Sequence, residues 1–163
     1  MEQYKEVLNY LANLDISFEI FKHPPLPTIE IAVKYWDKIP STHCKNLFFR
    51  NHKGNQHYLV IFECHQELNI HDLEKRLNQG KLSFASAERM GKYLGLKPGS
   101  VSPFGLINDS SHHVVLYIDK KLESSEFISF HPNDNTATVV IKTSDFKKFL
   151  NQRANKYYFR ELY

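Results

Sequence analysis

Residues 44–64 read CKNLFFRN-HKGNQ-HYLVIFEC and contain two apolar runs on either side of a polar segment. Both runs are rich in aromatic and β-branched side chains, which favour strands. The polar segment includes Gly54 and has the length of a hairpin connection. This stretch therefore predicts a β-hairpin.

Outside the hairpin, apolar residues recur at helical spacing, in most cases after a residue suited to cap a helix. The predicted helices are residues 2–14, a segment capped by Thr28, a segment capped by Asn69 that ends near Gly80, a segment capped by Ser86 that ends at Gly95, and a segment capped by Ser144. The other predicted strands are residues 17–21, 113–119, 126–132 and 136–142, with a tight turn over residues 133–135. Because these elements alternate irregularly, we predict an α/β (α+β) fold over residues 1–163: a single domain with a mixed, mostly antiparallel sheet surrounded by helices.

The composition sets limits on the class of protein. The chain has 163 residues, 42% of them hydrophobic, with 12 Phe and 9 Tyr, which argues against a disordered chain. No apolar run approaches the roughly 20 residues of a membrane span, and the start MEQYKEVLNYLANL lacks the pattern of a signal peptide. We therefore expect a cytoplasmic protein without a membrane partner. A net charge of +3 neither requires nor excludes nucleic acid.

Two cysteines, Cys44 and Cys64, stand apart without CxxC spacing, which suits a reducing compartment. Each has a histidine beside it, His43 and His65, so a metal site has to be considered. Neighbouring residues of a strand point to opposite faces, and zinc ligands are usually spaced two to four residues apart. We therefore expect no metal and no cofactor.

Three places carry residues suited to chemistry. Lys45 and Asn46 open an apolar strand, and residues 99–105 form a loop whose backbone N–H groups could bind an anion. His131 follows a strand and could bind or shuttle a proton near neutral pH. Each also has a plain structural interpretation: a solvated lysine, an ordinary turn, or a half-exposed histidine. The chain has no G-x-S-x-G, P-loop or H-E-x-x-H motif.

Taken in order, five stretches resemble one family, the YbaK-like domain, which also occurs as the editing insertion of bacterial prolyl-tRNA synthetases. They are HPPLPTIEIA (23–32), CKNLFFRN (44–51), KPGSVSPFGLIND (97–109), HVVLYIDKKL (113–122) and FHPNDNTATVVIKTSDFKKFL (130–150). The chain is most similar to the freestanding ProX type, and the resemblance covers roughly residues 4–150. Asn133-Asp134 departs from the family pattern, and residues 156–160 are not explained by it.

The resemblance implies hydrolysis of the ester that joins a wrong amino acid to the tRNA 3′ end. It also implies that Lys45 contacts the region of the terminal adenosine and that Gly99 to Pro103 form the family's G-x-x-x-P loop. The expected catalytic residues are Lys45, Gly99, Ser100, Val101, Ser102, Pro103 and His131. The expected substrate-binding residues are Phe21, Pro27, Thr28, Ile31, Val33, Asn46, Phe104, Gly105, Asn133 and Asn135.

The expected partner is the 3′ end of tRNA(Pro) carrying alanine. A synthetase pocket sized for proline cannot strongly reject a smaller residue, so a second site that excludes proline completes a double sieve. Serine and cysteine remain open as substrates, as do a different mischarged tRNA and a non-catalytic module that binds tRNA or a synthetase. Prolyl-tRNA synthetase and an elongation factor are candidate further partners, and we expect a monomer.

Overall fold

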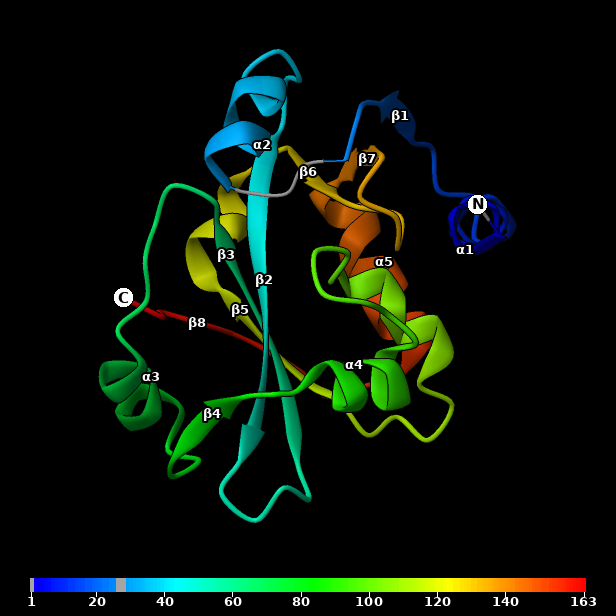
Figure 1. The fold of residues 1–163 in the computed structure, drawn as a ribbon. Coiled ribbons are helices and arrows are strands. Elements are labelled where there is room, and N and C mark those ends of the chain that lie inside the picture. Colours follow the sequence, from blue (N-terminus) through cyan, green and yellow to red (C-terminus); the bar gives the residue numbers. More distant parts are fainter. Residues whose placement is uncertain (1, 26–28) are drawn as a thin grey trace.

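The computed structural model describes residues 2–25 and 29–163, and its helices and strands are arranged around one sheet (Figure 1). The strands are β1 (Glu19–Lys22), β2 (Thr42–Asn51), β3 (His57–Glu63), β4 (Leu82–Phe84), β5 (Val115–Asp119), β6 (Phe127–Phe130), β7 (Ala137–Lys142) and β8 (Tyr157–Arg160). The α-helices are α1 (Glu2–Asn13), α2 (Ile29–Trp36), α3 (Ile70–Leu77), α4 (Ala87–Leu94) and α5 (Thr143–Arg153). Two 3₁₀ helices are η1 (Pro103–Asn108) and η2 (Lys120–Ser124).

The sheet has the order β1-β7-β6-β2-β3-β5-β8, and β4 pairs with β2 outside this path. The pairs β1–β7, β6–β7, β2–β3 and β2–β4 are antiparallel, whereas β2–β6, β3–β5 and β5–β8 are parallel. The predicted fold, a mixed and mostly antiparallel sheet with helices around it, is confirmed, and so is the hairpin over residues 44–64. β2 pairs with β6 only at Thr42 and His43 and then separates from it.

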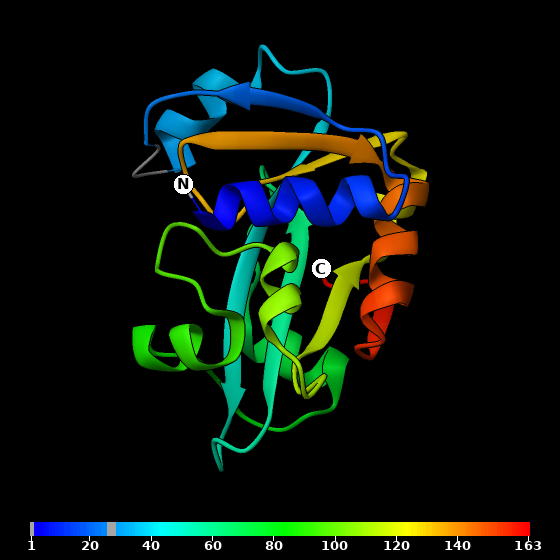
Figure 2. The same ribbon diagram turned by 90° about the vertical axis from the view of Figure 1, so that its right-hand side faces the viewer.

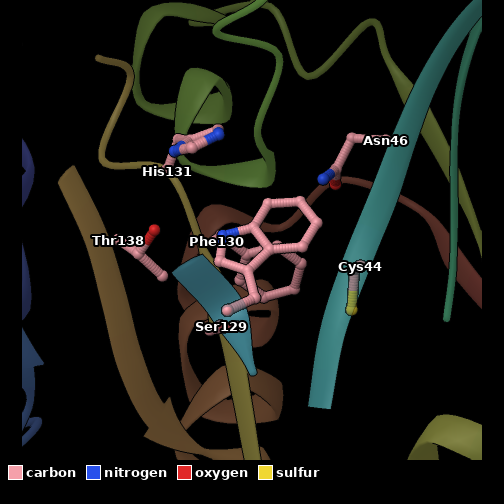
Figure 3. A pocket seen from close by; sticks show the side chains of 7 residues that line it. Cys44, Asn46, Ser129, Phe130, His131 and Thr138 are labelled. Atoms are coloured by element: carbon pink, nitrogen blue, oxygen red, sulfur yellow. The ribbon is translucent and has the colours of Figure 1, made fainter. Parts of the chain in front are cut away.

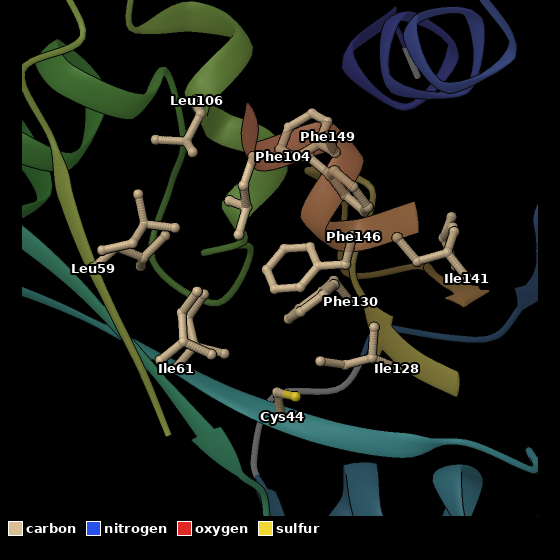
Figure 4. Close-up of a cluster of buried hydrophobic side chains, with 14 of the residues drawn as sticks. Cys44, Leu59, Ile61, Phe104, Leu106, Ile128, Phe130, Ile141, Phe146 and Phe149 are labelled. Carbon is tan, nitrogen blue, oxygen red and sulfur yellow. The ribbon is translucent and has the colours of Figure 1, made fainter. Parts of the chain in front are cut away.

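Helices cover both faces of the sheet (Figure 2). Because strand side chains alternate, Phe48 faces one buried cluster and Phe49 faces another. The larger cluster lies under α1, α4, η1 and α5, and Figure 4 shows its aromatic centre of Phe104, Phe130, Phe146 and Phe149. The second cluster lies under α3, and a third and smaller one lies under α2.

Several predicted helix ends are confirmed, and one is wrong. The Asn69 side chain accepts from the Asp72 N–H, and Ser86 accepts from the Arg89 N–H, as expected of N-caps. Gly95 ends α4 in the left-handed conformation at φ 66°. Ser144 is not a cap, because α5 already begins at Thr143, which follows β7 directly. The Thr28 cap falls outside the described residues.

The sequence-based predictions also missed elements or misjudged their length. The connection between β6 and β7 spans residues 131–136 and is longer than the predicted tight turn. The predicted loop over residues 97–105 includes the start of η1, and the C-terminal residues form β8, which pairs with β5. β4 was missed as well. No helix among the described residues combines the length and apolar character that a membrane span requires.

Candidate active site

A small pocket lies where β2 separates from β6, and Figure 3 shows the side chains around it. It encloses about 200 Å³ of space that includes its open mouth. The residues that line it come from α2, β2, β6 and β7 and the turn after β6: Trp36, Cys44, Asn46, Ser129, Phe130, His131 and Thr138. The pocket therefore joins segments that are distant in the sequence.

His131 is held in one tautomer at this pocket. Its Nδ1 atom lies 2.7 Å from the Ala137 carbonyl oxygen, and because a carbonyl only accepts, Nδ1 carries the proton. Burial lowers the pKa of His131 below its usual value, against a smaller opposing effect of the same hydrogen bond. The ring is therefore neutral at pH 7, and its Nε2 atom is a hydrogen-bond acceptor.

Two further polar atoms of the pocket residues are buried without a partner. Among the described residues, neither Asn46 Oδ1 nor Trp36 Nε1 makes a hydrogen bond. A buried polar group left unpaired costs about 1–3 kcal/mol, so such atoms are uncommon in native structures unless something else satisfies them. The pocket thus offers acceptors and a donor for a small polar ligand.

His43 holds Trp36 in place. The two rings are stacked at 5.1 Å with an interplanar angle of 9°. His43 Nε2 donates to the carbonyl oxygens of Trp36 at 3.0 Å and Ile39 at 3.2 Å, and its Nδ1 atom accepts from the Ser129 hydroxyl. Burial lowers the pKa of His43, so this arrangement keeps a neutral ring. The end of α2 is thereby tied to the start of β2 and to β6.

The loop over residues 99–105 uses several of its N–H groups internally. Ser100 donates to Lys97 O at 3.1 Å, Gly105 donates to Ser102 O at 3.0 Å, and Phe104 donates to the Ser102 hydroxyl at 3.1 Å. Pro103 has no N–H group. The predicted use of the whole loop as an anion nest is therefore too broad: within the described structure, only the N–H groups of Gly99, Val101 and Ser102 remain without a partner.

Asn133 and Asn135 connect this loop to the turn that carries His131. Asn133 is buried, adopts φ 62° and donates from Nδ2 to Phe104 O at 3.3 Å. Asn135 Nδ2 lies 3.7 Å from the position that a Cβ atom on Gly99 would take. At Gly105 a Cβ atom would lie 2.8 Å from the Leu96 side chain, so Gly105 permits close packing. These contacts place the loop beside His131.

Lys45 lies on the other face of β2 from Asn46, since neighbouring strand residues point in opposite directions. Its Nζ atom donates to Gln66 O at 2.8 Å and lies 5.8 Å from the centre of the Phe62 ring. The structure therefore does not bring the Lys45 side chain into the lining of the pocket. It holds the ammonium group near the turn after β3.

Comparison with known proteins identifies the family. The model of the aminoacyl-tRNA editing domain matches residues 23–149, which include the pocket, the loop and Lys45. The chain belongs to this family. It is 38% identical over 157 residues to the prolyl-tRNA editing protein ProX of Acetoanaerobium sticklandii, with 96% of each chain covered. The resemblance inferred from the sequence motifs is confirmed.

Other relatives of this editing domain extend beyond bacteria. Prolyl-tRNA synthetase associated domain-containing protein 1 of Xenopus laevis is 31% identical over 151 residues, which is 91% of this chain and 90% of that protein. A solved structure described as a candidate trans-editing enzyme for prolyl-tRNA synthetase superposes with a TM-score of 0.71. It covers 98% of this chain and 96% of that one at 18% identity, so it supports the fold alone.

The other predicted substrate residues of the editing domain lie around α2. Phe21 and Val33 are half-buried and pack against the small cluster that contains Trp36, whereas Ile31 is 39% exposed. None of these three residues lines the pocket. Pro27 and Thr28 lie outside the described residues. The predicted pocket walls Phe21, Ile31 and Val33 therefore do not line the pocket, and only Phe21 and Val33 pack against the cluster of Trp36.

Sequence reasoning missed most of the pocket lining of the editing domain. Trp36, Cys44, Ser129, Phe130 and Thr138 were not predicted as substrate-binding residues. Trp36 is the single tryptophan of the chain, which is a signal that could have drawn attention to it. The sequence pattern of the others is that of ordinary strand residues. They line one pocket only because β2, β6 and β7 lie close together in the sheet.

The expectation that Cys64 and His65 point to opposite faces of a strand is wrong. Cys64 and His65 do not point apart on a strand, because β3 ends at Glu63. The Cys64 Sγ and His65 Nδ1 atoms lie 3.5 Å apart, and with Glu63 they form a group of three potential ligands. Burial and the Glu63 carboxylate raise the pKa of the Cys64 thiol to about 11, which keeps it protonated.

Proposed function

We propose that this chain, with residues 1–163 acting as one editing domain, is a trans-editing hydrolase for mischarged tRNA(Pro). Its main substrate is Ala-tRNA(Pro), and its products are alanine and free tRNA(Pro). The observation that carries this proposal is the pocket with the unpaired atoms of Asn46 and Trp36 in a chain 38% identical to a prolyl-tRNA editing protein. An aminoacyl ester offers the matching groups: an ammonium donor and a carbonyl acceptor.

Binding of the aminoacyl group follows from the hydrogen-bonding capacity of the pocket. The α-ammonium group donates to Asn46 Oδ1 and to the Nε2 atom of neutral His131. Trp36 Nε1 donates to an oxygen of the substrate. These contacts hold the ester in one orientation, and orientation of this kind supplies a large share of the rate for an ester that is already labile.

Hydrolysis then needs a water molecule and stabilisation of the negative charge that develops on the carbonyl oxygen. Water adds to the ester carbon and the bond to the ribose oxygen breaks. The ribose oxygen takes one proton of the water, and the other is released to solvent as alanine leaves as its carboxylate. The free N–H groups of Val101 and Ser102 are the donors proposed for the developing oxyanion. The neighbouring ribose hydroxyl activates the water, as the family resemblance implies, and Lys45 contacts a phosphate or ribose oxygen outside the pocket.

Discrimination against proline follows from the rigidity of the pocket. The rings of Trp36 and Phe130 line a small space, and the stacking of His43 on Trp36 keeps the indole from moving aside. The methyl group of alanine fits such a space, whereas the proline ring requires displacement of packed side chains. The site therefore acts as the second sieve after a synthetase pocket that admits alanine.

The partners follow the same proposal. The substrate is the 3′ end of tRNA(Pro), and the protein acts on tRNA released by prolyl-tRNA synthetase, either free or bound to an elongation factor. A monomer in the cytoplasm remains our prediction.

Deacylation of Ala-tRNA(Pro) and Pro-tRNA(Pro) by the wild type and by Lys45→Ala tests this proposal. We expect rapid release of alanine, no release of proline, and a loss of at least about 100-fold in the variant, because the proposed contact of Lys45 with a phosphate or ribose oxygen of the substrate is removed. Lys38→Ala, which removes an exposed lysine after α2, is the matched control and should behave as the wild type. Seryl and cysteinyl esters of tRNA(Pro) complete the panel. Absence of cleavage of every ester would refute the catalytic proposal.

A further inference from the structure

A group of basic side chains lies at the far end of the β2 face that carries the pocket residue Asn46. Cys44, Asn46, Phe48 and Arg50 alternate along that face, and Arg50 pairs across the hairpin with His57. Figure 1 shows α2 near one end of β2 and the hairpin turn at the other, with α4 beside the strand. Arg89 and Lys92 of α4 belong to the same basic group as Arg50.

The guanidinium groups of Arg50 and Arg89 converge on Gly54. A Cβ atom on Gly54 would lie 2.9 Å from Arg89 Nη2 and 3.1 Å from Arg50 Nη1. Gly54 adopts φ 72°, a conformation that favours glycine, so the hairpin turn leaves room for both cations. Two like charges held so close together repel each other, and a bound anion removes this repulsion.

Arg89 is fixed in this position by a partly buried hydrogen-bond network. Its Nη1 atom donates to Gly54 O at 2.9 Å and to His57 Nε2 at 3.0 Å. His57 Nδ1 therefore carries the proton and donates to His113 Nε2 at 2.9 Å. Burial first, and then the nearby His113, Arg89, Arg50 and Lys92, lower the pKa of His57 to about 4. His57 is thus a neutral positioning residue for Arg89.

No carboxylate neutralises this group within the described residues. Arg50, Arg89 and Lys92 form no ion pair there, whereas Arg76 pairs with Asp72 and Lys147 pairs with Glu123 elsewhere on the protein. Glu88 is the acidic residue of the first turn of α4, and it does not pair with them either. Within the part of the chain that the structure describes, the Nη2 atom of Arg89 and the whole guanidinium group of Arg50 also lack a hydrogen-bond partner, so both can bind an anion.

We propose that Arg50, Arg89 and Lys92 form a phosphate-binding site for the RNA backbone of the substrate tRNA. This inference rests on the proposed function for the identity of the RNA. Arg50 lies four positions after Asn46 along the strand, which is about 13 Å at 3.3 Å per residue. A stacked strand carries one phosphate per about 3.4 Å of helix axis, so the site lies about four nucleotides from the ester. It therefore faces the junction of the single-stranded 3′ end with the acceptor stem.

Binding of an uncharged RNA minihelix, made of the tRNA(Pro) acceptor stem and 3′ end, tests this site by fluorescence anisotropy at several salt concentrations. We expect Arg50→Ala to weaken binding about tenfold and to reduce the salt slope by about 1, as for a lost phosphate contact. Lys92→Ala, an exposed change that leaves the fold intact, should act in the same direction. Arg76→Ala on α3, under the opposite face of the sheet, is the matched arginine control and should bind as the wild type.

Hydrolysis of alanyl-adenosine separates this site from the proposed function, because that ester has no phosphodiester. We expect Arg50→Ala and Lys92→Ala to cleave it at the wild-type rate. If the wild type cleaves no ester, the proposed function is refuted. Minihelix binding by the variants still tests the phosphate site independently. Unchanged minihelix binding by both variants would overturn the inference. Calorimetry with inorganic phosphate is the second measurement. If the wild type binds phosphate tightly, and if Arg50→Ala abolishes this binding but leaves minihelix affinity unchanged, the site binds free phosphate. That result would overturn the RNA proposal.

Discussion

The two ends of the same β2 face differ in which of their polar groups lack a partner. At the pocket end, two uncharged atoms have no partner in the described ranges 2–25 and 29–163: Asn46 Oδ1 and Trp36 Nε1. At the hairpin end, both nitrogens of the His57 ring are satisfied, and it is the cations of Arg50 and Arg89 that have no counter-charge among the described residues. The first arrangement suits a small polar group, and the second suits an anion.

Because of this difference, one strand can bind two chemically different parts of a single substrate. A buried amide oxygen keeps its full desolvation cost until a ligand pairs with it, which makes the pocket selective for an ester of the right size and shape. A partly exposed cation is already solvated, so it adds affinity for any phosphate and little selectivity. We therefore expect recognition of the amino acid at one end and general RNA affinity at the other.

The largest expected effect comes from a substitution that changes only the pocket end of the β2 face. Asn46→Leu removes the unpaired amide and keeps a side chain of similar size, so cleavage of Ala-tRNA(Pro) should fall about 100-fold in kcat/KM. The free energy of unfolding should not decrease, because no internal hydrogen bond of Oδ1 is lost. Deacylation kinetics and urea unfolding measure the two quantities, and minihelix affinity should stay at the wild-type value. A stability loss with full activity would show that Asn46 is structural.

The second expected effect is a loss of folding stability in acid, caused by the histidines near both ends of the β2 face. The pKa values of His43, His57 and His131 are lowered by burial, so the unfolded state binds more protons than the folded state below about pH 6.5. The free energy of unfolding should therefore decrease as the pH falls from 6.5 toward 4, the range set by His57. His57 alone contributes about 1–2 kcal/mol between pH 7 and pH 5.

Urea unfolding at pH 7 and pH 5 checks this effect, with His57→Gln beside the wild type and His52→Gln as a control at an exposed position. The first variant should show a weaker dependence on pH, and the second should match the wild type. An identical dependence in all three proteins would contradict the assignment to His57.

The smallest expected effect comes from a substitution that strains the backbone at the hairpin end of the β2 face. Gly54→Ala places a Cβ atom at φ 72° and close to both guanidinium groups, which should cost about 1 kcal/mol of stability and weaken minihelix binding. Gly80→Ala is the matched control, since Gly80 has φ 76° with open space around its Cβ position. Equal loss of minihelix affinity in both variants would show that backbone strain and not the arginines explains the result.

Much of the local structure could be predicted because it depends on neighbouring residues. The hairpin over residues 44–64 follows from two apolar runs and a polar turn, and the caps at Asn69 and Ser86 follow from side chains that reach backbone N–H groups three residues ahead. Ser144 carries the same kind of signal and is not a cap, since β7 leads directly into α5. Local patterns therefore predicted the kind of element better than its first residue.

The sequence by itself determined the hairpin, the mixed α/β fold and, through its motifs, membership of the editing family. Only the tertiary structure decided that Trp36 and Thr138 share a pocket with Asn46, that the C-terminal residues extend the sheet beside β5, and that Arg50 meets Arg89 over Gly54. The physical reason is the sequence separation of the residues that make each contact. Caps and turns depend on contacts within a few residues, whereas these sites depend on strand order and on the point where β2 separates from β6, which no local pattern encodes.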